Sequence, residues 1–180
     1  SANETAGVRW YEIRQDSDSD SWYIFQEGTY TSPNGKHAWL ASMGIDMNGN
    51  IAMGYSGMGG TTNTYVSSYY TGRFENDPLG VMTIEETLLD AGGSNISGTN
   101  RYGDYSKLAL DPSNQKDFWF ITENKQGSQI SNPVGVFQIV SDNDYDLGVV
   151  DIPSPTSSAF SGPVNVTASI YNYGQSPVSN

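Results

Sequence analysis

The stretch that decides the fold is Trp39-Leu-Ala-Ser-Met-Gly-Ile-Asp-Met-Asn-Gly-Asn-Ile-Ala-Met-Gly-Tyr-Ser56. Two runs of small and apolar residues, each about one strand long, flank the cluster Asp46-Met-Asn-Gly-Asn50. Asn and Gly in such a cluster favour a tight turn with positive φ. The stretch therefore predicts a β-hairpin whose turn spans residues 46–50.

A second stretch with the same layout begins about 60 residues further along. Residues 105–122 predict a strand, a turn headed by Asp111 and Pro112, and a returning strand that contains Phe118 and Trp119. A repeated hairpin is typical of modular all-β arrays, although two unrelated hairpins would give the same pattern. We interpret the two stretches as a structural repeat.

The composition agrees with turn-rich β structure. The chain of 180 residues has 20 Gly and 12 Tyr but only 8 Lys and Arg, a mixture that disfavours helix. No window keeps apolar residues at helical spacing for three turns, and the best candidate, residues 82–90, fits strand alternation equally well. The sequence therefore predicts an all-β protein.

The predicted strands fall into repeated groups. Residues 8–28 supply two strands, residues 38–90 supply a complete four-stranded antiparallel unit, and residues 105–140 supply three strands. Four-stranded units repeated radially are the blades of a β-propeller. We therefore expect residues 1–141 to form an incomplete β-propeller.

The tail has a different character. After an acidic segment and a Pro-bounded junction at residues 151–158, Val164–Tyr171 alternates as a half-buried strand does. This is the beginning of an immunoglobulin-like β-sandwich, which needs about seven strands. We therefore expect residues 142–180 to hold the junction and the first strands of a truncated second domain.

A family resemblance agrees with this division. The segments that carry it are residues 73–82, residues 98–106, the pair Asp111-Pro112 and the pair Phe118-Trp119. They resemble a propeller module of large secreted bacterial proteins of the Bacteroidetes type, and the tail from Asp146 is similar to the cell-adhesion-related Ig-like repeats of the same class.

The resemblance implies a secreted, surface-associated segment that binds glycans or proteins and is not itself catalytic. It also leaves two alternatives open. In the first, the segment is an accessory part of a secreted hydrolase, either sialidase-like or a protease. In the second, it is a secretion-system substrate captured with its machinery.

Charge and residue types exclude several function classes. A net charge of −12 repels nucleic acids and anionic membrane surfaces but supplies oxygen ligands for Ca²⁺. The chain has no Cys, a single His, His37, and no apolar run of 18 residues, so we expect no thiolate site, no multi-histidine metal site and no spanning helix. The expected partner is a protein or glycan surface.

Two acidic clusters are candidate calcium sites. Asp16, Asp18 and Asp20 alternate with serine, and Glu27 occupies the twelfth position of the loop, as in an EF-hand. Ser21 stands where an EF-hand needs Gly, and strand rather than helix follows, so a looser Ca²⁺ loop or a solvated turn fits better.

The second cluster lies at the junction and consists of Asp142, Asp144 and Asp146. Three carboxylates this close repel one another unless a cation or water lies among them. We expect Ca²⁺ to rigidify the junction here, or the carboxylates to stay hydrated. Asp46, Asn48 and Asn50 fit turn residues better than ligands.

Arg101, Asp104 and Tyr105 are the candidate ligand-binding residues. Charge-assisted hydrogen bonds and aromatic faces suit polyols, whereas the structural alternative is an Arg–Asp pair that braces the strand. Tyr65, Tyr69 and Tyr70 could likewise form an exposed adhesive stripe or pack across strands.

Catalytic signatures are missing from the sequence. It contains no Gly-x-Ser-x-Gly elbow and no His-Glu-x-x-His motif, and the segment Thr87–Gly92 lacks the hydroxyl of an aspartic-protease loop. Glu85 and Glu86 are adjacent and should face opposite sides of a strand, which is poor geometry for a glycosidase pair.

Both ends of this arrangement leave sheets without neighbours. Open sheet edges and exposed apolar faces favour pairing with other chains. We therefore expect these ends to be covered by another polypeptide or by further parts of the same protein.

Overall fold

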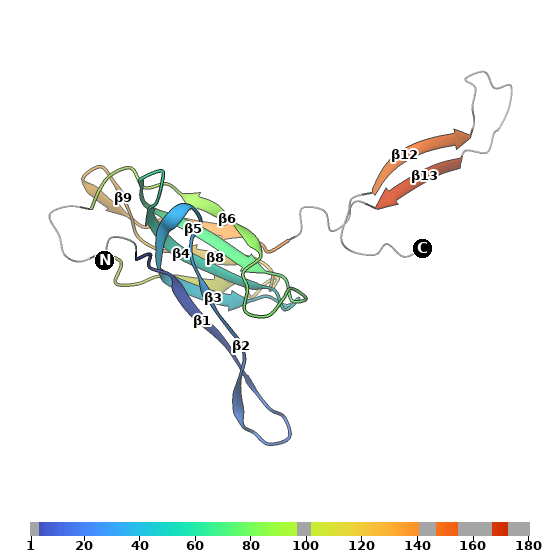
Figure 1. Ribbon diagram of the computed structural model, residues 1–180, viewed down its shortest axis with the longest axis horizontal. Helices are drawn as coiled ribbons and strands as arrows, with labels where there is room; N and C mark the ends of the chain where they lie inside the picture. The colour runs from blue at the N-terminus through green and yellow to red at the C-terminus, as the bar shows by residue number, and fades with distance from the viewer. Residues whose placement is uncertain (1–3, 97–101, 141–146, 155–166, 173–180) are drawn as a thin grey trace. The chain divides into compact units, whose positions relative to one another are not determined.

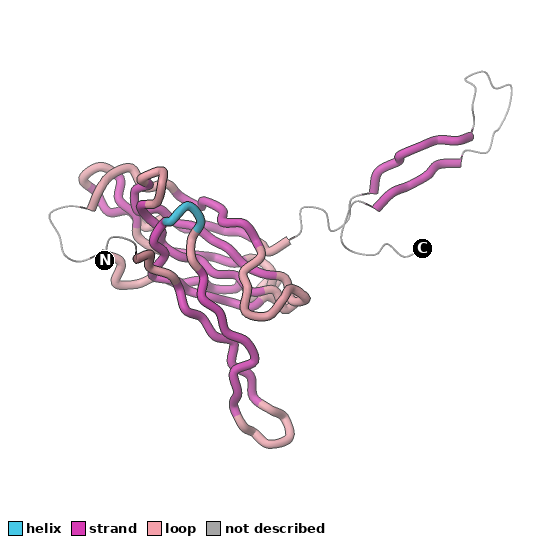
Figure 2. The backbone as a smooth tube through the Cα atoms, viewed as in Figure 1, coloured by secondary structure: helices cyan, strands magenta, loops and turns pink. Residues whose placement is uncertain are grey.

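A computed structural model describes residues 4–96, 102–140, 147–154 and 167–172 (Figures 1 and 2). The chain divides into two compact units, Ser1–Ile139 and Val140–Asn180. The described regular structure consists of antiparallel strands and one 3₁₀ turn, η1, at Pro33–Gly35. The predicted all-β class is confirmed.

The first unit is organised around a four-stranded antiparallel sheet, the central sheet. Its strands are β3 (Lys36–Ile45), β4 (Ile51–Gly59), β5 (Thr64–Arg73) and β6 (Ile84–Asp90), in the order β3-β4-β5-β6. The prediction of one such unit over residues 38–90 is confirmed.

The predicted first turn of the central sheet is also confirmed. One carboxylate oxygen of Asp46 accepts the backbone N–H groups of Asn48 and Asn50 at 2.8 and 2.9 Å. Gly49 has a φ of 83°, a conformation that costs glycine little. Asp46 therefore acts as a turn residue, as the sequence indicates.

Two smaller sheets belong to the same unit. A hairpin is formed by β1 (Val8–Gln15) and β2 (Trp22–Tyr30), and a three-stranded sheet has the order β11-β8-β7. Its strands are β7 (Lys107–Leu110), β8 (Phe118–Ile121) and β11 (Val134–Phe137). These are the two and three strands that the sequence predicts, although the last one ends at residue 137 rather than 140.

One short hairpin was not predicted. The strands β9 (Asn124–Gln126) and β10 (Gln129–Ser131) pair across a turn in which Gly127 has a φ of 60°. Their residues are almost all polar, so no apolar alternation marks them.

The three-stranded sheet packs on one face of the central sheet, the β8 face. Glycine makes this approach possible, because a Cβ on Gly54 would overlap the ring of Phe120 and one on Gly44 would lie 2.8 Å from Leu108. Phe137 stacks on Tyr70 at a centroid distance of 3.9 Å. The resulting core cluster is apolar throughout.

The opposite face of the central sheet, the hairpin face, packs against the base of β1–β2. Ala38, Met53, Tyr55 and Tyr69 form its buried cluster, with Tyr30 of β2 against it. Because both faces are covered, every residue of β4 from Ile51 to Gly57 is buried. Antiparallel sheets commonly leave one face in water, and this one does not.

Burial on both faces decides between the two interpretations of the tyrosines of β5. Tyr69 is 6% exposed and stacks on Tyr55, and Tyr70 stacks on Phe137. Only Tyr65, 42% exposed, lies at the surface. The exposed adhesive stripe is therefore wrong, and packing across strands explains these residues.

The second unit contains one described hairpin, in which β12 (Leu147–Ser154) pairs with β13 (Thr167–Asn172). The described strand begins at Thr167, three residues after the predicted start at Val164. The Ig-like assignment of this unit stays a prediction.

Candidate functional site

The most concentrated polar chemistry in the described structure is a buried group on the hairpin face, the Glu86 cluster. It consists of Tyr30, Ser32, Lys36, Tyr55 and Glu86. Tyr30 ends β2, Ser32 precedes η1, Lys36 begins β3, Tyr55 lies in β4 and Glu86 lies in the edge strand β6. Three side chains from other parts of the chain, Ser32, Lys36 and Tyr55, thus converge on the carboxylate of Glu86, and Tyr30 joins through Tyr55.

The carboxylate of Glu86 is fully engaged. Its Oε1 lies 2.5 Å from Nζ of Lys36, and its Oε2 accepts hydrogen bonds from the hydroxyls of Ser32 and Tyr55. Both side chains of the ion pair are less than a tenth exposed. A buried charge pair persists only when its remaining polar atoms are also bonded, and the two hydroxyls meet that need.

The phenols extend the network. The hydroxyls of Tyr30 and Tyr55 lie 2.9 Å apart, and Nζ of Lys36 lies 5.2 Å from the centre of the Tyr69 ring. Burial raises the pKa of Tyr55, and the hydrogen bond to Glu86 raises it further. Burial also raises the pKa of Tyr30. Both phenols are therefore protonated at neutral pH and act as neutral donors.

A cavity of about 490 Å³ lies beside this cluster. It is lined by Tyr30, Pro33, Asn34, Met82, Thr83, Ile84, Glu85 and Glu86. Amide, phenol and carboxylate groups share its wall with apolar side chains. This mixture can hold a polyol, because hydroxyl groups bond to the polar atoms while the carbon skeleton packs on the apolar ones.

Glu85 lies next to Glu86 at an irregular point of β6. The pairing of β5 with β6 shifts between Tyr70 and Gly72, so that one residue of β5 faces two of β6, Glu85 and Glu86. Such a β-bulge breaks the alternation of side chains. Both glutamates border the cavity.

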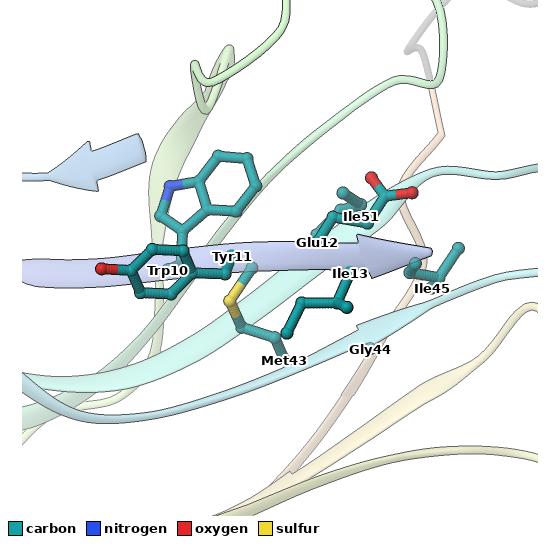
Figure 3. A pocket seen from close by; sticks show the side chains of 8 residues that line it. All are labelled: Trp10, Tyr11, Glu12, Ile13, Met43, Gly44, Ile45 and Ile51. Carbon is teal, nitrogen blue, oxygen red and sulfur yellow. The ribbon is translucent and has the colours of Figure 1, made fainter. Parts of the chain in front are cut away.

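A smaller cavity of about 230 Å³ lies between β1 and β3 (Figure 3). Its wall is mainly apolar and includes Trp10, Ile13, Met43 and Ile45. The Glu12 carboxylate is turned away from Met43 (Figure 3) and binds Arg14 at 2.6 Å and Gln26 at 2.5 Å. With its one acid already paired, this cavity offers little polar recognition.

Of the candidate ligand-binding residues of the sequence, Asp104 and Tyr105 line neither cavity. Arg101 lies outside the described residues, Asp104 is exposed, and Tyr105 is 86% exposed. Their loop is braced instead, because the Gly103 N–H donates to Glu123 at 2.9 Å and the Ser106 hydroxyl donates to the Leu40 carbonyl at 2.6 Å.

The bracing partner of this loop has an unusual backbone. Leu40 has a φ of 51° where the pairing of β3 with β4 shifts between Trp39 and Ser42. A β-bulge of this kind re-aims a strand, and a non-glycine residue there carries backbone strain. Gly103, with a φ of 67°, packs directly on the Leu40 side chain.

The first candidate calcium loop forms the exposed turn of the β1–β2 hairpin. One carboxylate oxygen of Asp16 accepts the N–H groups of Asp18 and Ser19 at 3.0 and 2.8 Å and the Ser19 hydroxyl at 2.9 Å. These hydrogen bonds lower the pKa of Asp16. Asp18 and Asp20 are exposed in the same turn.

The second candidate calcium cluster, Asp142, Asp144 and Asp146, lies outside the described residues. Within the part of the chain that the structure describes, no three His, Cys, Asp or Glu side chains gather closely enough to hold a metal ion. Calcium binding at either cluster stays a prediction.

Sequence reasoning missed most of the Glu86 cluster. Lys36 stands beside a turn, and Ser32, Tyr30 and Tyr55 lie in ordinary strand and turn contexts, so no local motif marks them. One signal was present, because Glu86 is a charged residue inside residues 82–90, a segment that fits the alternation of a strand. A charge at such a place needs a buried partner.

Comparison with known proteins gives no relative: no family model, no curated protein and no solved structure matches this chain. The described residues contain no helix that is long and apolar enough to cross a membrane. The function must therefore be argued from the geometry.

Proposed function

We propose that this chain is a non-catalytic binding and structural segment of a secreted, surface-associated bacterial protein. In this proposal the β1–β2 hairpin, the central sheet and the three-stranded sheet are successive blades of a β-propeller, and the second unit begins an Ig-like domain. The segment binds glycans or glycan-bearing proteins through the cavity beside the Glu86 cluster.

The observation that carries the proposal is the stacking of three antiparallel sheets with a central sheet covered on both faces. Blades of a propeller pack face to face in this way. The outermost described face fits the same scheme, because Trp119, Ile121, Val134 and Val136 are each more than 40% exposed on the outer side of the three-stranded sheet. An apolar sheet face of this kind is suited to a further neighbour.

The chemistry of the cavity favours binding over catalysis. Glu86 is held by Lys36, Ser32 and Tyr55, which leaves little of its carboxylate for activating a water. The only histidine, His37, accepts the backbone N–H of Ala6 at 3.0 Å through Nδ1. Asn34 and Glu85 are exposed at the cavity wall and can bond to a sugar hydroxyl.

A glycan array tests the binding part of the proposal. The 180-residue chain should bind a defined set of glycans, and the double variant Asn34→Gly/Glu85→Gln should lose at least about tenfold in affinity, since the amide of Asn34 is removed and the charge of Glu85 is neutralised. Glycine suits Asn34 because its φ is 60°. Glu75→Gln, at an exposed site outside the cavity, is the matched control and should bind as the wild type does. Equal loss in both variants, or no glycan bound, would overturn the glycan site.

An apolar dye tests the structural part separately. The chain should bind 8-anilinonaphthalene-1-sulfonate in its folded state, and Trp119→Lys/Val136→Lys should reduce that binding, because both side chains lie on the exposed face. A folded chain that binds no dye would contradict the expectation that a further sheet covers this face. The glycan result does not depend on it.

A further inference from the structure

The cavity beside the Glu86 cluster has charge of one sign on its wall. Its lining residues, all within the described part of the chain, include two acids, Glu85 and Glu86, and no Lys, Arg or His. Lys36 is taken up by its ion pair with Glu86, and its side chain is only 7% exposed. A concave wall of low dielectric constant concentrates the field of such charges. The cavity therefore repels anionic ligands and attracts cationic ones.

The two acids of the wall differ in what they already bind. The carboxylate of Glu86 is bonded to Lys36, Ser32 and Tyr55. Glu85 is exposed, and none of the ion pairs found among the described residues involves it. A carboxylate accepts up to about four hydrogen bonds. Glu85 is therefore the acid of this wall that can bind a ligand cation.

The rest of the wall is held in place by hydrogen bonds within the chain. The carbonyl of Asn34 accepts the Thr61 N–H at 2.9 Å, and the Thr83 N–H donates to the Gly72 carbonyl at 2.9 Å. The hydroxyl of Thr83 donates to the carboxylate of Asp77. A site formed in advance loses little free energy to ordering when a ligand binds, so a contact with Glu85 contributes directly to affinity.

We propose that this cavity selects glycans that carry a free amino group, and that the Glu85 carboxylate binds the ammonium. The inference rests on the proposed glycan site and names its ligand class. A hydrogen bond between ammonium and carboxylate is about twice as strong as a neutral one, whereas an acidic sugar brings a second negative charge to Glu85. Glucosamine is therefore preferred over its N-acetylated form, and sialylated or uronic-acid glycans are rejected.

The other lining residues favour a sugar over a basic peptide side chain. Pro33, Met82 and Ile84 lie beside the polar groups of the wall, and the C–H groups of a sugar ring pack on apolar side chains of this kind. The exposed amide of Asn34 can bond to a hydroxyl of the same ring. A lysine side chain would satisfy Glu85 but has no hydroxyl for Asn34.

Calorimetry with three tetrasaccharides of one β-1,4-linked skeleton tests the selection. Tetraglucosamine has an amino group on carbon 2 of each ring, chitotetraose an acetamide and cellotetraose a hydroxyl. At about pH 6 and about 0.15 M salt, where long-range attraction is screened, the 180-residue chain should bind tetraglucosamine about tenfold more tightly than either of the others. Tetralysine carries the same number of side-chain amino groups without sugar rings and should bind at least about tenfold more weakly than tetraglucosamine.

A matched pair of variants locates the ammonium site. Glu85→Gln keeps the size of the side chain but removes its charge, and it should reduce the preference for tetraglucosamine over cellotetraose to less than about twofold. Glu75→Gln removes one negative charge at an exposed site outside the cavity and should keep the preference of about tenfold. Urea unfolding of both variants checks that they are folded.

The outcomes separate this selection from the glycan site on which it rests. Equal binding of the three tetrasaccharides, tighter binding of a sialylated or uronic-acid glycan, or equal loss of the preference in the two variants would overturn the selection and leave a glycan site in place. Binding of tetralysine as tight as that of tetraglucosamine would overturn it too, because the attraction would then need no sugar. If no glycan of any charge binds, the glycan site fails and the selection fails with it.

Discussion

The two faces of the central sheet are stabilised by different interactions. On the β8 face, glycines of β3 and β4 receive the side chains of Leu108 and Phe120, and the contact is apolar. On the hairpin face, the ion pair of Lys36 and Glu86 is buried with the phenols of Tyr30 and Tyr55. The β8 face depends mainly on shape, although the hydroxyls of Ser56 and Thr122 meet there at 3.1 Å, whereas the hairpin face depends on pairing of buried charges and hydroxyls.

The largest expected effect comes from breaking the polar face. Lys36→Met leaves the Glu86 carboxylate buried without its counter-charge, which should lower the free energy of unfolding by about 3–5 kcal/mol. Lys36→Met/Glu86→Leu removes both charges and should recover much of that loss. Urea denaturation of both variants measures the difference. A double variant no more stable than the single one would show that the hydroxyls, rather than the ion pair, hold this face.

Adding volume on the β8 face should lower the free energy of unfolding, because the two sheets leave no space for it. In Gly54→Ala the added methyl group overlaps the ring of Phe120, and such overpacking costs about 1–3 kcal/mol. In the control, Gly93→Ala, the methyl group meets the flexible end of Gln126, so the change should stay within about 0.5 kcal/mol. Equal stability of the two variants in thermal unfolding would show that the sheets can move apart without cost.

Alkaline pH should lower the free energy of unfolding through the buried phenols of the hairpin face. The folded-state pKa values of Tyr30 and Tyr55 are raised by burial, so above about pH 10 the unfolded chain releases protons that the folded chain keeps. The folded state then binds more protons, and the free energy of unfolding falls as pH rises. Below about pH 9 these phenols contribute no pH dependence.

The variant Tyr30→Phe sharpens this measurement. It removes one of the two buried titrating groups and should flatten the decline of stability between pH 9 and about 11, at a cost of about 0.5–1.5 kcal/mol at neutral pH for the lost hydrogen bond. Tyr102→Phe measures a separate contribution, because burial also raises the pKa of Tyr102 but its loop belongs to neither face, so it should flatten the decline by an amount of its own. A decline unchanged in Tyr30→Phe and reduced in Tyr102→Phe would assign the alkaline sensitivity to the loop.

The fold was predictable from the sequence where local patterns decide it. Asp46 and Gly49 mark the first turn, and the apolar runs on either side mark β3 and β4, so the central sheet could be drawn in advance. The bulge at Leu40 has no such mark, because leucine rarely takes a positive φ.

The candidate site was less predictable for a related reason. Local alternation does not mark the β-bulge at Glu85 and Glu86, because that bulge arises from pairing with β5. Ser32 and Lys36 reach Glu86 from the chain between β2 and β3. Such contacts join residues about 50 apart in the sequence, and short-range patterns cannot specify them.

Calcium should have the smallest effect, and only on the hairpin side. The turn with Asp16, Asp18 and Asp20 is exposed at the end of β1–β2, and open loops of this kind bind Ca²⁺ with dissociation constants of about 10⁻⁴–10⁻³ M. One millimolar Ca²⁺ should then raise Tm by at most a few degrees, and EDTA should reverse it. Asp18→Asn/Asp20→Asn should abolish the response. If the response survives, the ion belongs to Asp142, Asp144 and Asp146 instead. If EDTA changes nothing in the wild type, neither cluster holds calcium, and Asp16 serves only to close the turn through the hydrogen bonds it already accepts.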